Sequence, residues 1–240
     1  MRRSRLYLSQ SLTENAEIVL DGERAHYLRT VLRLRVGNEI VVFNGRGGEF
    51  EAKVLSIERR KVRLRLASWC DRDAESRLGI HLGLAIPKGE RMDWAVQKAV
   101  ELGVAGIFPL LAEHGNVLLK GERAERKRQH WQAIVVSACE QCGRNRVPVV
   151  ALPQALASWV EQQAGGIVLD PSGVGFAELD PPERELRLLI GPEGGLSPGE
   201  IQLARAKGFR AACLGPRILR VETAVVAGLA VTQNLWGDLH

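Results

Sequence analysis

Residues 186–200 read LRLLIGPEGGLSPGE, and this stretch decides the class of fold. Its first five residues form a short apolar run typical of a buried strand, and its last four predict the start of a helix. Ser197 suits the N-cap position and Pro198 suits the first helical position. Glu200 suits the N3 position, where it would complete a capping box with Ser197. The glycine-rich turn GPEGG therefore lies between a buried strand and a helix, the repeating unit of α/β sheets.

The same alternation of strand and helix continues on both sides of this stretch. Apolar runs typical of strands occur at 80–86, 106–111, 166–169, 186–190 and 211–214, and apolar residues at helical spacing mark 92–100 and 122–142. This order predicts an α/β domain with a mainly parallel sheet that is covered on both faces. Ligands bind such sheets at the carboxyl ends of the strands, so the turns that follow the strands form the candidate site.

The first 70 residues follow a different pattern. Val62, Leu64 and Leu66 alternate with basic residues, and the apolar run 40–43 ends in an Asn-Gly pair, a strong hairpin signal. We expect a short helix at 26–34 and otherwise a small antiparallel sheet or barrel with a basic outer surface. The predicted division is a β-barrel domain at 1–70, a polar linker at 71–79 and the α/β domain at 80–240.

Charge is unevenly shared between these two parts. Residues 1–70 hold 14 basic and 8 acidic side chains, a net charge of +6, whereas residues 71–240 have a net charge of −1. A small basic module beside a neutral one favours a part that binds a polyanion and a part that does chemistry. A solvated basic face without a partner is the alternative.

Several classes of protein are disfavoured by the rest of the sequence. No apolar run approaches the ~20 residues that a membrane helix needs, and the first residues lack the apolar core of a signal peptide. We therefore expect a cytoplasmic protein that does not enter a membrane. Cys139 and Cys142 form a C-x-x-C pair at the end of a helical stretch, but no second pair completes a zinc site, so we expect no metal.

Three strand ends carry unusual turns, at 169–173, 191–195 and 214–220, and the second, GPEGG, is the most informative of them. It matches neither dinucleotide nor P-loop fingerprints, and Glu193 stands where it would repel a phosphate. Glycines allow a flat ligand to approach the backbone closely. A ligand with an adenine and a ribose but no phosphate fits this turn, and S-adenosylmethionine, with its cationic sulfonium, is such a ligand. A plain glycine-rich turn is the alternative.

Longer motifs make the sequence recognisable. LLIGPEGGLSPGEI and LGPRILRVETA resemble the cofactor-binding half of the SPOUT methyltransferases. Arg5, HYL at 26–28, KGERM at 88–92 and EQCGRNRVP at 140–148 extend the likeness to the RsmE family of 16S ribosomal RNA uridine N3-methyltransferases. One departure is the segment 113–118, EHGNVL, where relatives often carry basic residues.

This resemblance implies a fold, an activity and partners. The fold is an N-terminal PUA-like β-barrel followed by a SPOUT-type α/β domain whose chain forms a trefoil knot. The activity is S-adenosylmethionine-dependent methylation of N3 of a specific uridine in 16S ribosomal RNA of the small subunit, by a homodimer. A non-catalytic RNA-binding assembly factor and a related SPOUT transfer-RNA ribose methyltransferase are the alternatives.

The resemblance also implies roles for individual residues. We expect cofactor contacts from Leu169, Pro171, Gly191, Glu193, Gly194, Leu214, Gly215, Ile218, Leu219 and Arg220. We expect RNA contacts from Arg2, Arg3, Arg5, Arg29, Arg33, Lys88, Arg91 and Arg144.

The chemistry needs a cation and a base. Uridine N3 loses a proton on methylation, so a cation should stabilise the anionic uracil, and Arg220 is the first choice with Arg144 second. Glu222, Glu193 and Glu140 are the carboxylates that could take the proton, with Glu222 placed among the catalytic residues. An ion pair between Arg220 and Glu222 is the structural alternative.

Overall fold

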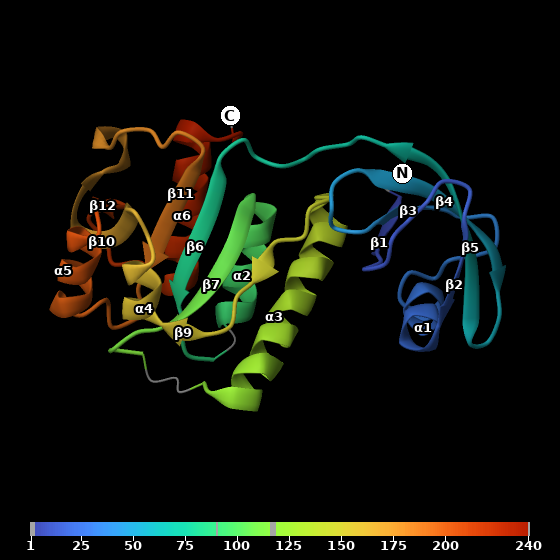
Figure 1. Cartoon of the computed structure of the whole chain (residues 1–240), viewed down its shortest axis with the longest axis horizontal. Helices are drawn as coiled ribbons and strands as arrows, with labels where there is room; N and C mark the ends of the chain where they lie inside the picture. The colour runs from blue at the N-terminus through green and yellow to red at the C-terminus, as the bar shows by residue number, and fades with distance from the viewer. Residues whose placement is uncertain (1–2, 90, 116–118, 240) are drawn as a thin grey trace. The chain divides into compact units, whose positions relative to one another are not determined.

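The structure is a computed structural model that describes residues 3–89, 91–115 and 119–239. The chain divides into two compact units (Figure 1). The N-terminal unit comprises Met1–Glu75 and Cys139–Val147, and the C-terminal unit comprises Ser76–Ala138 and Pro148–His240. Residues 71–78, predicted as part of the linker, form no helix or strand.

The N-terminal unit is built on a five-stranded sheet in the order β1-β3-β4-β5-β2. Its strands are β1 (Ser4–Tyr7), β2 (Glu17–Asp21), β3 (Glu39–Phe43), β4 (Glu49–Ile57) and β5 (Lys61–Cys70). Neighbours pair antiparallel except β1 and β3, which run parallel. The alternation of Val62, Leu64 and Leu66 is confirmed, because all three side chains are fully buried in the core of this unit.

The short helix of this unit begins and ends earlier than predicted. α1 spans Gly22–Thr30, whereas the apolar spacing predicted 26–34. Beyond Thr30 the regular helix ends, and the amides of Val31 and Leu32 both donate to the carbonyl of Tyr27. Arg33 then takes a left-handed backbone conformation with φ of 49°, which ends helical geometry while Leu34 still reaches the core.

The segment 139–147 belongs to the N-terminal unit through buried polar contacts. Arg5 Nη1 lies 2.5 Å from Glu49 Oε2, and its Nη2 donates to Asn145 Oδ1. Asn145 Nδ2 donates to the Arg72 carbonyl at 2.9 Å, and Asn145 itself is 1% exposed. Glu140 accepts a hydrogen bond from the Tyr7 amide at 2.9 Å. Periodicity and composition gave no indication of this grouping, because it rests on side-chain hydrogen bonds.

The C-terminal unit contains a parallel sheet in the order β12-β10-β11-β6-β7-β8, with β9 also paired to β7. The strands are β6 (Gly79–Ala85), β7 (Val104–Leu111), β8 (Val149–Val150), β9 (Gln154–Ala155), β10 (Gly166–Gly175), β11 (Glu185–Ile190) and β12 (Phe209–Cys213). The helices are α2 (Arg91–Glu101), α3 (Gly121–Cys142), α4 (Leu156–Glu161), α5 (Pro198–Ala206) and α6 (Val221–Trp236), with a 3₁₀ turn at Phe176–Glu178. The predicted α/β class is confirmed.

Helices cover both faces of this sheet. Leu189 packs in a cluster with Trp159 of α4 and Ala204 of α5. Leu188, its neighbour on β11, instead meets α6 at Gly228, where an added Cβ would lie 3.5 Å from Leu188 Cδ2. Because neighbouring residues on a strand point to opposite faces, α6 lies on the face opposite α4 and α5. None of the helices in the described ranges is long and apolar enough to cross a membrane.

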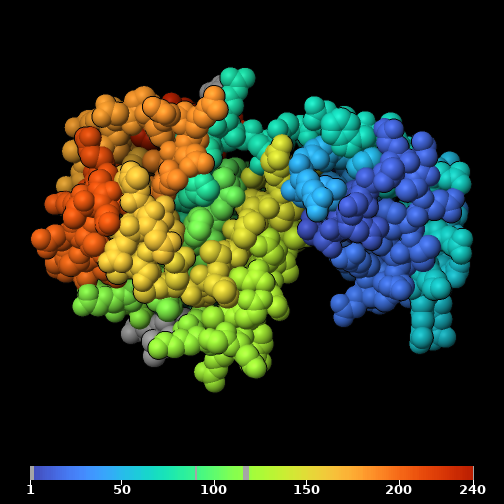
Figure 2. All heavy atoms as spheres, in the orientation of Figure 1, coloured from blue at the N-terminus to red at the C-terminus, as the bar shows by residue number. Residues whose placement is uncertain are grey.

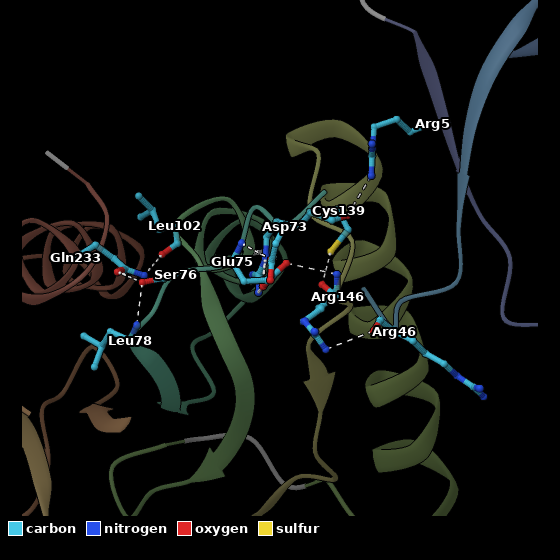
Figure 3. A network of polar contacts seen from close by, with 11 residues as sticks. Arg5, Arg46, Asp73, Glu75, Ser76, Leu78, Leu102, Cys139, Arg146 and Gln233 are labelled. Atoms are coloured by element: carbon cyan, nitrogen blue, oxygen red, sulfur yellow. Dashed lines mark hydrogen bonds and ion pairs between the residues drawn. The ribbon is translucent and has the colours of Figure 1, made fainter. Parts of the chain in front are cut away.

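The N-terminal end of the C-terminal unit is fastened to its last helix. Ser76 Oγ donates to Gln233 Oε1 at 2.8 Å, and Gln233 Nε2 donates to the Leu102 carbonyl at 3.0 Å (Figure 3). Gln233 is 1% exposed, so both ends of its amide are satisfied inside the unit. This network holds α6 against the turn between α2 and β7.

Candidate functional site

A pocket of about 350 Å³ lies where β11 and β12 end, beside a loop within β10, and where α5 and α6 begin. Nine of the ten residues expected to contact a cofactor line it: Leu169, Pro171, Gly191, Glu193, Gly194, Leu214, Gly215, Ile218 and Leu219. Arg220, the tenth, forms the N-cap of α6 beside the lining residue Val221. The three strand-end turns named from the sequence therefore meet in one place.

The first wall of the pocket is a loop that bulges out of β10. Leu169 and Val174 both pair with Ala212 of β12, so residues 170–173 leave the ladder and the strand then rejoins it. Asp170 Oδ1 accepts hydrogen bonds from the Ser172 amide and hydroxyl at 2.7 and 2.6 Å, which closes a tight turn. The apolar run predicted the strand to end at Leu169, because pairing after a four-residue excursion leaves no periodic signal.

The second wall is the GPEGG turn after β11. The Gly195 amide donates to the Pro192 carbonyl at 2.9 Å, and Gly195 has a φ of 73°, so the turn needs glycine at this position. The predicted capping box is confirmed. The Ser197 amide donates to Glu200 Oε2 at 2.8 Å, and the Glu200 amide donates to Ser197 Oγ at 3.2 Å.

Glu193 connects this turn to the start of α2. Its Oε1 accepts a hydrogen bond from Arg91 Nη1 at 2.7 Å and another from the Lys88 amide at 3.3 Å. Two residues expected to hold RNA thus contact a residue expected to hold the cofactor. The Glu193 side chain keeps about a third of its surface exposed, so one carboxylate faces both the pocket and solvent.

The third wall is the loop between β12 and α6. Gly215 has a φ of 85°, and Ile218 is 79% exposed at the rim of the pocket. Small residues in α6 allow the helix to approach closely, because an added Cβ at Gly228 would lie 3.3 Å from Leu169 Cδ1. Arg217, which sequence reasoning did not single out, also lines the pocket, although it belongs to the quoted LGPRILR motif.

Arg220 and Glu222 do not form the ion pair held open as an alternative. In the part of the chain that the structure describes, no hydrogen bond or ion pair joins them, and Arg220 is exposed. Glu222 lies in the first turn of α6, and its Oε2 is enclosed without a hydrogen-bond partner among the described residues. An enclosed carboxylate oxygen without a donor suits a group that accepts a proton.

The structure separates the expected RNA-binding residues into two groups. Arg3, Arg33 and Lys88 are exposed, and Arg29 and Arg91 are half-buried. Arg5 and Arg144 are buried, with 6% of each side chain exposed, and their guanidinium groups pair with Glu49 and Glu75. Arg2 lies outside the described residues, as do Asn116, Val117 and Leu118 of the departing segment.

Packing explains one member of the C-x-x-C pair, Cys139. Cys139 is fully buried at the end of α3, burial raises the pKa of its thiol to about 12, and its sulfur donates to the Arg146 carbonyl at 3.7 Å (Figure 3). Across the described ranges, no group of three or more metal-ligating side chains comes together.

Known proteins resemble this chain over its whole length. The RNA methyltransferase domain family matches residues 74–233, and the RNA methyltransferase PUA domain family matches residues 20–67. Ribosomal RNA small subunit methyltransferase E of Buchnera aphidicola subsp. Schizaphis graminum is 38% identical over 99% of this chain and 98% of its own length. The chain belongs to this family. The predicted resemblance is thereby confirmed.

Solved structures of the same family agree in fold. A Legionella pneumophila protein described as a methyltransferase in complex with the bound cofactor SAM is 37% identical, with a TM-score of 0.94 over 100% of both chains. Ribosomal RNA small subunit methyltransferase E from Neisseria gonorrhoeae, bound to S-adenosyl methionine, is 34% identical with a TM-score of 0.93 over 100% of both chains. The PUA-like N-terminal part and the α/β C-terminal part are family features, and the knot stays a prediction.

Proposed function

We propose that this protein transfers a methyl group from S-adenosylmethionine to N3 of a uridine in 16S ribosomal RNA of the small subunit. The observation that carries the proposal is the pocket beside the β10 loop and the ends of β11 and β12, which is lined by nine residues chosen from the sequence alone. The family relatives named as small-subunit methyltransferases and the two SAM-bound structures support the same activity.

The residues of the pocket fit this cofactor. Leu169, Leu214 and Leu219 supply apolar surface for a purine, and glycines at 191, 194 and 215 leave the backbone open to a flat ligand. Glu193 places a carboxylate at the pocket, which favours a cationic sulfonium and disfavours a phosphate. When bound, S-adenosylmethionine supplies an electrophilic methyl group.

Arg220 is proposed to hold the uracil during the reaction. A uracil that loses its N3 proton carries negative charge on O2 and O4, and a guanidinium beside these oxygens stabilises that charge. Arg220 is exposed at the N-cap of α6, directly after Leu219 of the pocket lining. Arg144, the second choice, would first have to leave its enclosed pair with Glu75.

Glu222 is the proposed acceptor of the N3 proton. The bond from the methyl carbon to sulfur breaks as the bond to N3 forms, and the N3 proton passes to a carboxylate. Among the three carboxylates considered, Glu193 is occupied by Arg91 and Glu140 by the Tyr7 amide. Glu222 Oε2 is enclosed and has no donor among the described residues, so it is chemically free to accept the proton.

Exposed cations of the N-terminal unit are proposed to bind the RNA backbone. Arg3 and Arg33 contribute, together with the half-buried Arg29, and Arg59, Arg60 and Lys61 add charge at the end of the β4–β5 hairpin, which stands out in cyan in Figure 2. Such contacts give affinity, whereas base contacts give specificity. The predicted boundaries 1–70 and 80–240 are retained as a functional division into RNA binding and methyl transfer.

A homodimer in the cytoplasm completes the proposal. Ala227 and Ala230 are half-buried small residues of α6, and Leu235 near the end of α6 is 42% exposed. The family resemblance supports a partner of the same kind.

The deciding experiment is mass spectrometry of nucleosides from 16S RNA after incubating purified protein, S-adenosylmethionine and small subunits from a strain lacking the enzyme. We expect 3-methyluridine to appear. Methylation of a ribose hydroxyl in transfer RNA instead would establish the alternative enzyme. Calorimetry without heat from S-adenosylmethionine, in the absence and in the presence of RNA, would establish a non-catalytic assembly factor.

A further inference from the structure

A second hollow, of about 690 Å³, lies within the N-terminal unit. Trp69 and Cys70 at the end of β5, Arg3 directly before β1, and Arg72 line it, and Glu49 and Cys142 contribute from β4 and the end of α3. Nothing in the methyl-transfer chemistry above uses these residues. The hollow combines an exposed aromatic ring with exposed guanidinium groups.

Trp69 is held in place although about half of it faces solvent. Its exposed fraction is 47%, yet its amide donates to Glu14 Oε1 at 2.8 Å. The indole lies directly on Gly48, where an added Cβ would come within 2.4 Å of Trp69 Nε1. Gly48 also has a φ of 64°, so both the ring and the backbone require glycine there. An exposed ring that is fixed beforehand loses little entropy when a flat ligand stacks on it.

The position of Trp69 depends on a bulge in β5. Phe50 and Ala52 of β4 pair with Trp69 and Leu66, so three residues of β5 match two of β4. Without the bulge, the alternation of Leu64 and Leu66 would place Trp69 with the outward basic residues of β5. A bulge that re-aims one side chain at the end of a strand is a recurrent feature next to binding sites.

The charges around the hollow leave one guanidinium weakly held. Glu49 lies 2.5 Å from Arg5 but 3.5 Å from Arg72, so the buried Arg5 already neutralises this carboxylate. Arg3 pairs with Glu51 and, at 3.0 Å, with Glu39. Arg72 keeps 46% of its side chain exposed, so it is the cation most available to an external anion. The N-terminal unit as a whole, with 17 basic and 12 acidic side chains, carries a net charge of +5.

An aromatic platform next to an available cation suits one kind of ligand. Single-stranded nucleic acids are bound by stacking of unpaired bases on aromatic rings and by basic groups along the backbone. We infer that this hollow binds an unpaired nucleotide of the substrate RNA, with its base stacked on Trp69 and a phosphate beside Arg72. The inference rests on the proposed function, and it assigns the RNA a contact with the N-terminal unit that is distinct from the methyl-transfer pocket.

The cysteines allow both sites to be tested in one experiment on the full-length chain. Cys70 is exposed and lines the hollow, Cys213 lines the methyl-transfer pocket, and Cys139 is buried. We expect single-stranded decauridylate to slow alkylation of Cys70 by N-ethylmaleimide and to leave Cys213 unchanged. We expect S-adenosylmethionine to slow alkylation of Cys213 and to leave alkylation of Cys70 unchanged. Cys139 should stay unlabelled in every sample.

Variants then separate stacking from charge. Trp69→Ala should weaken decauridylate binding ~10-fold with an unchanged salt slope, and Trp69→Phe should restore most of it. Arg72→Ala should reduce the salt slope by about 0.7, the value for one phosphate on a single strand. Arg63→Ala removes the same charge from an exposed position on β5 and serves as the matched control. A strand with abasic riboses should bind wild type and Trp69→Ala equally.

The outcomes distinguish the two proposals. Protection of Cys213 by S-adenosylmethionine without protection of Cys70 by saturating RNA would overturn the stacking site and leave the methyltransferase intact. Equal affinity of wild type for the abasic and the normal strand would reduce the hollow to an anion site and also overturn it. Failure of S-adenosylmethionine to protect Cys213 or to release heat would count against the proposed function itself.

Discussion

Arg91 Nη1 lies 2.7 Å from Glu193 Oε1, so the first turn of α2 is joined to the GPEGG turn by an ion pair across 102 residues of sequence. The Lys88 amide donates to the same oxygen. Arg91 and Lys88, expected to bind RNA, are thereby in direct contact with Glu193, expected to bind the cofactor. A phosphate that captured Arg91 would change the surroundings of the pocket.

Arg91→Ala should weaken S-adenosylmethionine binding, because Glu193 loses the contact that holds its turn. Both side chains are more than 30% exposed, so the effect on the free energy of unfolding should stay within ~1 kcal/mol. Lys98→Ala is the control, because it breaks the equally exposed Lys98–Glu101 pair on the same helix. Calorimetry and thermal melting check both variants. Equal cofactor affinity in the two variants would show that the Arg91–Glu193 pair does not shape the pocket.

Arg220→Ala should lower the single-turnover rate of methylation by ~10²–10³, the scale seen when one oxyanion donor is removed. Cofactor affinity should change little, because Arg220 is not part of the pocket lining. Arg217→Ala is the complementary variant, because Arg217 lines the pocket and its loss should raise the dissociation constant of S-adenosylmethionine instead. Rates on small subunits are measured beside calorimetry. A normal rate for Arg220→Ala would remove this residue from the mechanism.

Arg5→Ala should destabilise the protein rather than weaken RNA binding directly. Its guanidinium pairs with Glu49 and Asn145 in the interior, and removal of one partner of a buried ion pair costs ~3–5 kcal/mol. Arg3→Ala, two residues earlier and just before the same strand, removes an exposed cation and should leave the melting temperature unchanged while flattening the salt dependence of RNA binding. Urea unfolding and filter binding distinguish the two. An Arg5→Ala protein as stable as wild type would contradict this and would favour the original assignment of Arg5 to RNA binding.

Glu140→Gln should stabilise the protein at pH 8 and lose this advantage toward pH 4. Burial raises the pKa of Glu140, and the Tyr7 amide and Arg5 oppose this only in part. A carboxyl group with a raised pKa in the folded state contributes stability that is lost as pH rises through that value. The amide keeps an acceptor for Tyr7 without the buried charge. Urea unfolding from pH 4 to 8 checks the trend.

Glu49→Gln should show the opposite trend within the same unit. Burial alone would raise the pKa of Glu49, but the hydrogen bond and charge of Arg5 outweigh it and the net shift is downward. Such a group stabilises the fold above its unfolded-state pKa, and the contribution is lost as pH falls through the folded-state value. The variant should therefore be less stable than wild type at pH 7, with the deficit shrinking in acid. Parallel pH profiles for Glu49→Gln and Glu140→Gln would contradict both assignments.

Local patterns predicted the sheet, the capping box and the three pocket turns. Each rests on a feature of a few consecutive residues, such as the apolar run 186–190 or the S-P-G-E start of α5, and local features survive folding unchanged. The resemblance then extended these turns to an enzyme family. Neither the local patterns nor the family resemblance predicted the Glu193–Arg91 contact. Two exposed side chains far apart in sequence give no indication that they will pair.

The positions that sequence reasoning misjudged depend on tertiary contacts. Arg5 and Arg144 have the same side chain as the exposed Arg3, and only the neighbouring Glu49 and Glu75 make them internal. Trp69 was not singled out from the sequence. The strict alternation of inward and outward residues that we assumed for this strand is altered by the bulge before Trp69. The helix at 26–34 was displaced because the left-handed conformation of Arg33 has no signature in an arginine.

The inclusion of residues 139–147 in the N-terminal unit has a consequence for how this chain can be divided. A truncated chain starting at Ser76 would keep Glu140, Arg144 and Asn145 but lose Tyr7, Glu75 and Arg5, which pair with them. The segment 139–147 would then lose the contacts that hold it in place and would become exposed to solvent. The first 75 residues therefore cannot be exchanged as an independent unit. A chimaera that exchanges them between relatives must exchange residues 139–147 as well.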